Sequence, residues 1–158
     1  MLLLRGYAPA EFFSKLLAGV VGSAQLISGA VGGFEIFEWT AYGQEASVPI
    51  QSQSSSAGLG RRLVFDNTGG FATGVALSNP STLTGNITVN IRDEGGNLLQ
   101  TSTITLPANG HTSFMLPSTY AVTNGIRGSV EFVAQFFQPS VIGLRAGPAG
   151  TLTTIPAL

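Results

Sequence analysis

Apolar and polar residues alternate along much of this chain with a period of two, which is typical of a β-strand that buries one face. The segment Gly85–Leu106 shows the pattern most fully, because two alternating stretches flank the turn-forming residues Gly95–Asn97. The apolar positions in these stretches are Ile87, Val89, Ile91, Ile104 and Leu106. The pattern predicts a β-hairpin whose apolar side chains face a common core.

Shorter stretches of the same kind recur at intervals of about ten residues, separated by turn-forming residues. They are Ser23–Ser28, Gly33–Trp39, Glu45–Ile50, Arg61–Phe65, Phe71–Ser78, Gly110–Leu116, Arg127–Phe136, Ser140–Ala146 and Thr151–Pro156. Many short strands and little helix predict an all-β fold, an antiparallel β-sandwich of the immunoglobulin-like or jelly-roll-like kind. With 158 residues in the chain, we expect one such domain over residues 23–158, with Gln51–Gly60 as a loop. Pro49 places its strand at a sheet edge or ends it.

Residues 1–22 are predicted to form a helical, apolar extension. Pro9 suits the first turn of a helix and Gly22 suits its end. Between them, apolar side chains recur at helical spacing at Phe13, Leu16, Leu17 and Val20. A helix of about a dozen residues is marginal alone in water, so we expect it to pack on the domain itself or on a neighbouring subunit.

The uninterrupted apolar run Leu16–Val21 is shorter than the core of a secretion signal and far shorter than a membrane span. We therefore interpret the extension as part of the fold, with an uncleaved targeting sequence as the alternative, and expect no membrane span.

The chain carries unusually little charge. Charged residues make up 9% of it, against about 25% in ordinary globular domains, and none lies between Gly95 and Ile126. A free monomer normally carries charge that blocks edge-to-edge pairing of its strands. The composition therefore favours a surface covered by copies of the same chain or by a partner, and a net charge of −1 argues against nucleic-acid binding.

Several blocks in a defined order resemble a β-sandwich domain that is found, often in tandem, in large secreted and cell-surface proteins of soil bacteria. The blocks are Gly32–Phe37, Gly43–Ile50, Phe65–Ser81, Leu106–Pro117, Arg127–Phe132 and Val141–Leu158. The resemblance spans about residues 23–158 and implies an all-β fold in an extracellular or cell-surface setting, with no catalytic residues to carry over.

Two features depart from that pattern. The domain stands alone behind a helical extension, and the block Ala134–Pro139 places Phe136 and Phe137 where a polar, Gly-rich loop is expected. We predict that this pair lies near a hairpin tip, where exposed aromatic side chains often make contacts.

Three groups of residues could carry chemistry. His111, the one histidine, could join Ser113 or Ser118 and Asp66 in a hydrolase-like triad, but no G-x-S-x-G elbow presents a nucleophile. The interpretation we prefer for His111 is a polar residue where a turn meets a strand. A single histidine and no cysteine argue against a metal site.

Asp93 and Glu94 form the second group. Neighbouring carboxylates on one turn point apart and cannot bracket a glycosidic bond, so we interpret them as solvated turn charges.

The third group surrounds Trp39 and Tyr42, which together with Glu35 and Glu38 could form a sugar-binding platform. The alternative is a strand covered on both faces, with Glu35 at a rim or paired with an arginine such as Arg127 or Arg145.

The sequence thus predicts a non-enzymatic structural or adhesive unit, extracellular or at the cell surface, that associates with itself, as in a filament or layer. No cofactor or metal is expected. The candidate self-association residues are Phe12, Phe13, Leu16, Leu17, Val20, Phe136 and Phe137. A carbohydrate-binding module that uses Trp39 and Tyr42 to hold a surface glycan is the alternative, and a hydrolase is the third hypothesis.

Overall fold

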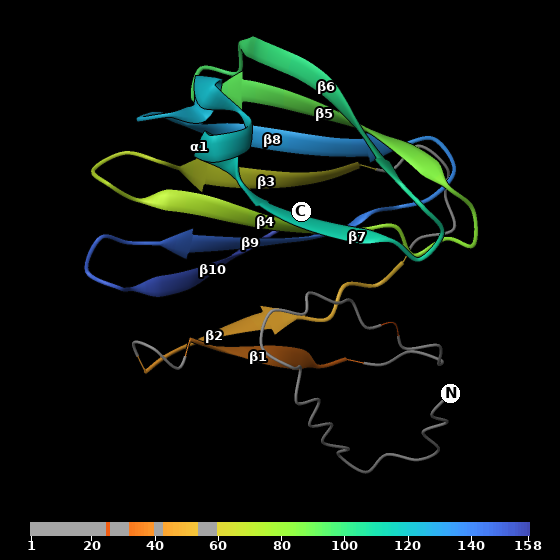
Figure 1. Ribbon diagram of the computed structural model, residues 1–158, viewed down its shortest axis with the longest axis horizontal. Coiled ribbons are helices and arrows are strands. Elements are labelled where there is room, and N and C mark those ends of the chain that lie inside the picture. The colour runs from red at the N-terminus through yellow and green to blue at the C-terminus, as the bar shows by residue number, and fades with distance from the viewer. Residues whose placement is uncertain (1–24, 26–31, 40–42, 54–59) are drawn as a thin grey trace.

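The computed structural model describes residues 25, 32–39, 43–53 and 60–158 (Figure 1). Its strands are β1 (Phe34–Trp39), β2 (Gln44–Pro49), β3 (Gly60–Asp66), β4 (Ala72–Ser78), β5 (Gly85–Asp93), β6 (Leu98–Leu106), β7 (His111–Met115), β8 (Arg127–Ala134), β9 (Ser140–Ala146) and β10 (Leu152–Pro156). Two short helical turns, α1 (Leu116–Thr119) and η2 (Ala121–Thr123), connect β7 to β8. The predicted helix of residues 9–20 and the predicted strand of residues 23–28 lie outside the described residues, Gln25 apart.

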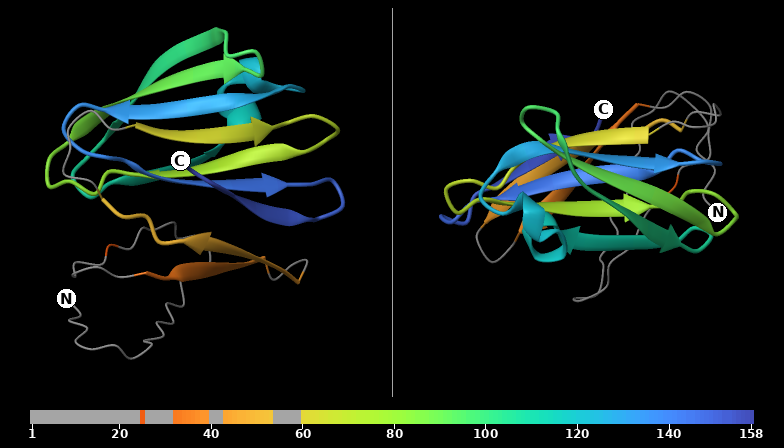
Figure 2. Two further views of the ribbon diagram at one scale, coloured as in Figure 1. Left: turned by 180° about the vertical axis from the view of Figure 1, so that it is seen from behind. Right: turned by 90° about the horizontal axis from the view of Figure 1, so that it is seen from above.

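The strands form two four-stranded sheets in the orders β3-β8-β5-β6 and β10-β9-β4-β7 (Figure 2). Every recorded strand pair is antiparallel. The all-β, antiparallel prediction is therefore confirmed. β1 and β2 form a separate two-stranded hairpin.

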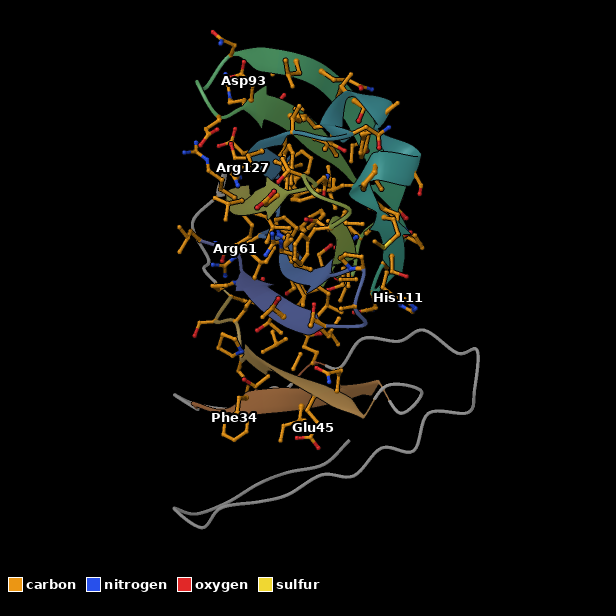
Figure 3. The ribbon with its side chains drawn as sticks, turned by 90° about the vertical axis from the view of Figure 1, so that its left-hand side faces the viewer. Phe34, Glu45, Arg61, Asp93, His111 and Arg127 are labelled. Atoms are coloured by element: carbon orange, nitrogen blue, oxygen red, sulfur yellow. The ribbon has the colours of Figure 1, made fainter. Side chains whose placement is uncertain are left out.

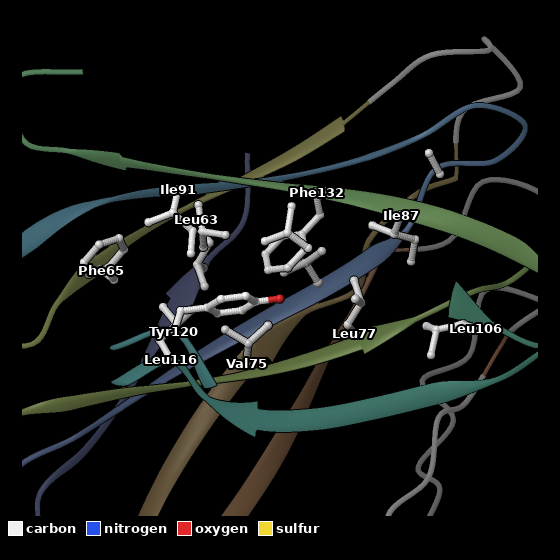
Figure 4. Packing of buried hydrophobic residues seen from close by; sticks show 14 residues of the cluster. Leu63, Phe65, Val75, Leu77, Ile87, Ile91, Leu106, Leu116, Tyr120 and Phe132 are labelled. Atoms are coloured by element: carbon white, nitrogen blue, oxygen red, sulfur yellow. The ribbon is translucent and has the colours of Figure 1, made fainter. Parts of the chain in front are cut away.

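One hydrophobic core joins the facing sides of the two sheets (Figure 4). Alternate residues of β5, namely Ile87, Val89 and Ile91, are fully buried, as the period of two predicted. They meet side chains from the other strands and from the β7–β8 connection. These are Leu63, Phe65, Val75, Leu77, Leu106, Leu116, Tyr120, Val130, Phe132, Ala134 and Val141.

The predicted hairpin of residues 85–106 is confirmed as β5 and β6. Ile87 lies opposite Ile104, and Gly96 occupies the turn with φ of +84°, a conformation that glycine adopts readily. The register shifts once, because Ile91 pairs with Gln100 while Arg92 pairs with Leu98. Leu99 is the extra residue of this bulge, so β6 is regular from Gln100 onward.

The segment that carries Phe136 and Phe137 is not a hairpin tip, which corrects the expectation from sequence. β8 pairs with β3 and β5, whereas β9 pairs with β4 and β10. The segment therefore crosses from one sheet to the other. Two consecutive strands joined by a short connection look the same in sequence whether they pair with each other as a hairpin or belong to different sheets. Only the hydrogen-bonded partners of each strand distinguish a hairpin from a crossing between sheets.

The β1–β2 hairpin lies beside β10 (Figure 1). Ala46 and Val48 of β2 are buried, and Pro49 ends the strand, as its missing N–H predicts. Beyond it, the side-chain amide of Gln51 both donates to the carbonyl of Val141 and accepts from its N–H. Gln51 thus hydrogen-bonds the backbone of Val141 as a neighbouring strand would. Val141 is a residue of β9 that does not pair with β10.

The end of the described chain covers the edge of β3. The Arg62 N–H donates to the Leu158 carbonyl at 2.8 Å, and the Leu158 N–H donates back to the Arg62 carbonyl at 2.9 Å. Because β10 belongs to the other sheet, this pairing links the two sheets along one side.

We expect neighbouring residues of β3 to respond very differently to truncation. Leu63 is fully buried and Val64 is 55% exposed, so Leu63→Ala leaves a cavity whereas Val64→Ala does not. Leu63→Ala should lower the free energy of unfolding by about 2–5 kcal/mol, and Val64→Ala should change it by less than about 0.5 kcal/mol. Urea unfolding of both variants measures the difference, and equal effects would contradict the assignment of the core face.

Candidate interaction surface

β6 is the outermost strand of its sheet, and β5 is the only described strand that pairs with it (Figure 2). It is nine residues long and contains neither a charged residue nor a proline. Natural edge strands are usually short, charged or interrupted, since a regular bare edge invites pairing with another chain. The long uncharged segment noted in the sequence therefore includes an exposed sheet edge.

The outer face beside this edge carries hydroxyl and amide groups. Thr101 donates to the side-chain oxygen of Asn90 at 3.0 Å, and Thr105 donates to that of Asn86 at 2.7 Å. Thr103 lies between them, opposite Thr88 of β5. These cross-strand pairs hold the outer face of β5 and β6 in a regular, uncharged array.

Exposed apolar side chains gather on the outer face of the β1–β2 hairpin. Phe34 is 69% exposed and Ile36 is 56% exposed on this face, and Ile50, beyond the end of β2, is 46% exposed. In Figure 3, Phe34 and Glu45 both point away from the two large sheets. The opposite face of the hairpin carries Ala46 and Val48, which are buried, so one face of β2 packs on the protein and the other faces solvent.

The two phenylalanines of the β8–β9 connection differ from each other. Phe136 is 82% exposed, the disposition expected of a contact residue. Phe137 packs against the core, with its ring over Gly85. A methyl group at Gly85 would meet that ring at 2.3 Å, so the glycine makes room for Phe137. Only Phe136 of this pair offers its ring to a partner.

The other candidate contact residues, Phe12, Phe13, Leu16, Leu17 and Val20, lie outside the described residues. The sugar platform lies largely outside them too. Tyr42 is not described, and of Trp39 only the backbone, paired with Gln44 in the β1–β2 hairpin, is described. The platform therefore stays a prediction.

The proposed catalytic triad is not assembled. His111 pairs with Ser78 at one end of β4, whereas Arg145, which binds Asp66, pairs with Thr73 near the other end. Five residues of strand separate these positions by roughly 16 Å. His111 and Ser113 share the exposed face of β7, as the alternation predicted.

The Asp93–Glu94 pair forms part of a tight turn. The Asp93 carboxylate accepts from the backbone N–H of Asn97 at 2.8 Å and from its side-chain amide at 2.9 Å. These hydrogen bonds, with the Asn97 side chain as the largest contributor, lower the pKa of Asp93. Glu94 is exposed. Asp93 and Glu94 therefore lie in a turn, as predicted.

Among the described residues, no group of three or more His, Asp or Glu side chains is placed to hold a metal ion.

Asp66 forms the densest charged cluster in the described part of the chain. Its carboxylate accepts from the Thr68 hydroxyl at 2.6 Å and from the Thr68 N–H at 3.0 Å. Arg145 of β9 lies 2.9 Å from it and Arg127 of β8 lies 3.3 Å from it. The Arg145 guanidinium also stacks 3.7 Å from the centre of the Phe71 ring. Asp66 is thus a partner of both arginines, and it ties the two sheets together. The side chain of Glu35 lies outside what the structure describes, so its pairing stays a prediction.

Two buried asparagines fix the strand ends, and neither was predicted from the sequence. Asn67 donates to the Thr123 carbonyl and accepts from the Thr73 N–H. Asn79 donates to the carbonyls of Leu83, Leu106 and Pro107, and it accepts from the Ser81 N–H. Both follow the last residue of a strand, a position where asparagine commonly hydrogen-bonds the backbone of a turn.

No match was found for this chain among models of protein families, among curated proteins or among solved structures. Its role is therefore inferred from its own residues. No described helix has the length and apolar character that a membrane span requires.

The contacts of Asp66 predict how stability depends on pH. The Thr68 hydrogen bonds, above all from the hydroxyl, and Arg127 lower the pKa of Asp66 from 3.8 to about 2. The ionised carboxylate therefore stabilises the folded state above pH 3.8, and this contribution is lost as the pH falls toward 2. We expect Asp66→Asn to lose less stability over that interval than the wild type, measured as urea midpoints at a series of pH values.

Thr68→Val tests the cause of the shift separately, because it removes the hydroxyl and leaves the backbone N–H. The pKa of Asp66 should rise toward its ordinary value in this variant, as followed by NMR titration of the carboxyl carbon. An unchanged pKa would show that the Thr68 N–H and Arg127, rather than the Thr68 hydroxyl, control this group.

Proposed function

We propose that this protein is a non-enzymatic β-sandwich, extracellular or at the cell surface, that serves as a structural or adhesive unit by associating with itself. The observation that carries the proposal is the uncharged outer edge of β6, which is regular from Gln100 onward. A sheet edge of this kind pairs readily with another chain, which makes it a means of assembly.

The layered architecture supports the fold class within this proposal. The core lies between two antiparallel sheets and draws side chains from both, which suits the antiparallel sandwich class, immunoglobulin-like or jelly-roll-like. Such sandwiches carry structural and adhesive roles in many surface proteins, and the resemblance of the sequence to domains of secreted bacterial proteins agrees with that setting.

The exposed apolar side chains support self-association as well. Phe34 and Ile36 on the β1–β2 hairpin and Phe136 on the β8–β9 connection present large apolar groups to solvent. Several ionisable groups of the described residues serve structural contacts instead, since Asp66 bridges the sheets, Asp93 caps a turn, and Arg62 pairs with Glu131 across strands at 3.2 Å. A filament or a surface layer is the sharper form of the proposal.

We expect the mass of the particles in solution to rise with protein concentration. Sedimentation velocity over about a hundredfold range of concentration measures this, because association follows mass action. Electron microscopy of the concentrated sample then separates a filament or layer from a closed oligomer. A single monomeric species at every concentration would contradict self-association, and binding to a glycan array by such a monomer would favour the carbohydrate-binding alternative.

A further inference from the structure

The two edges of the β3-β8-β5-β6 sheet, at β3 and at β6, are protected from further strand pairing to very different degrees. At β3, Arg62 pairs with the backbone of Leu158, and Arg61 donates to the Ser52 carbonyl at 2.8 Å. At β6, no other described strand pairs with the outer edge. β6 contains no charged residue that would repel an incoming strand.

The side chains of β6 also suit a strand identical to itself. Thr101, Thr103 and Thr105 are exposed on the outer face, while Ser102 and Ile104 point to the less exposed inner side. Since the strand has no formal charge, two copies can approach without the like-charge repulsion that prevents most surfaces from pairing with themselves. Threonines that lie opposite one another across antiparallel strands stabilise the pair.

We propose that β6 pairs antiparallel with β6 of a second copy, about a two-fold axis that passes beside Thr103. This rests on the proposed self-association and specifies the strand and register that carry it. The pairing would join two four-stranded sheets into one sheet of eight strands and would satisfy both bare edges at once.

The composition of the strand selects this register. With the axis at Thr103, Thr103 faces its own copy and Thr101 faces Thr105 of the second copy, so all three outer threonines face threonines, and only beyond them does Leu99 fall opposite Pro107. An axis at Ser102 would instead place Thr105 opposite Leu99, the bulged residue. An axis at Ile104 would place Thr101 opposite Pro107, which has no N–H to donate.

Disulfide cross-linking tests the proposal directly, because the chain contains no cysteine. Residues opposite one another in antiparallel strands have Cα atoms about 4.5–5.5 Å apart, which lies within the range that a disulfide spans. In Thr103→Cys, we therefore expect most of the protein to become a covalent dimer under mild oxidation, as seen by non-reducing electrophoresis. Thr88→Cys is the matched control, since Thr88 lies opposite Thr103 on the same face but one strand further from the edge, and it should remain uncross-linked.

The register is tested by mixing variants. Thr101→Cys and Thr105→Cys should cross-link to each other in the mixture far more than either does alone. Thr103→Lys and Thr103→Glu should each weaken association by about tenfold or more, because like charges would meet at the axis, and their mixture should restore it. Thr88→Lys, with the same charge one strand away, should retain the wild-type association.

Three outcomes contradict the proposal in whole or in part, and they differ in what they say about self-association. If the wild type associates but Thr103→Cys cross-links no more than Thr88→Cys, the β6 edge is not the interface while the proposed function stands. If the wild type remains monomeric and no variant cross-links, both are wrong. Efficient cross-linking of Thr103→Cys without the mixed Thr101–Thr105 product would reject the two-fold register.

Discussion

The structure depends on the apolar layer that two antiparallel sheets bury between them. β5 and β8 contribute Ile87, Val89, Ile91, Val130 and Phe132 to this layer, and each of these side chains is fully buried. At about 25 cal/mol per Å² of apolar surface removed from water, such side chains provide the main driving force for folding. Alternation along each strand is what makes this possible, because it leaves the opposite face free for polar groups.

The polar contacts secure the ends of that layer. Asp66, at the end of β3, binds arginines from both sheets, and Asn67 beside it satisfies backbone groups on either side. At the other end, Asn79 fills the same role for the turn after β4 and for the end of β6. Buried polar groups are costly unless they are hydrogen-bonded. Asn67 and Asn79 supply hydrogen bonds to backbone groups where the strands end, and they thereby stabilise the turns at those positions.

The strands and their buried faces were predictable because a period of two is local information. The β5–β6 hairpin was predicted with its core residues, since its turn and its alternation lie within one short segment. The sheet that each strand joins was not predictable, and this is why the β8–β9 connection was mistaken for a hairpin. The partners of Asp66 were missed for a related reason, because Arg145 lies 79 residues away. Pro117 lies in the first turn of the short helix α1, yet four residues are too few to give a periodic signal.

The distribution of charge accounts for the contrast between the two edges of the β3-β8-β5-β6 sheet. Its ion pairs, Arg62 with Glu131 and Arg127 with Asp66, lie on β3 and β8. Between Asn86 and Asn90 of β5 and between Thr101 and Thr105 of β6, hydroxyls and amides take their place and hydrogen-bond to one another across the strands, while Arg92 and Asp93 lie at the end of β5. A monomer gains nothing from an outer edge free of charge, since one lysine there would block unwanted pairing at little cost. An edge that pairs with an identical strand has such a reason, because like charges would meet directly across the joined edge and destabilise the pair.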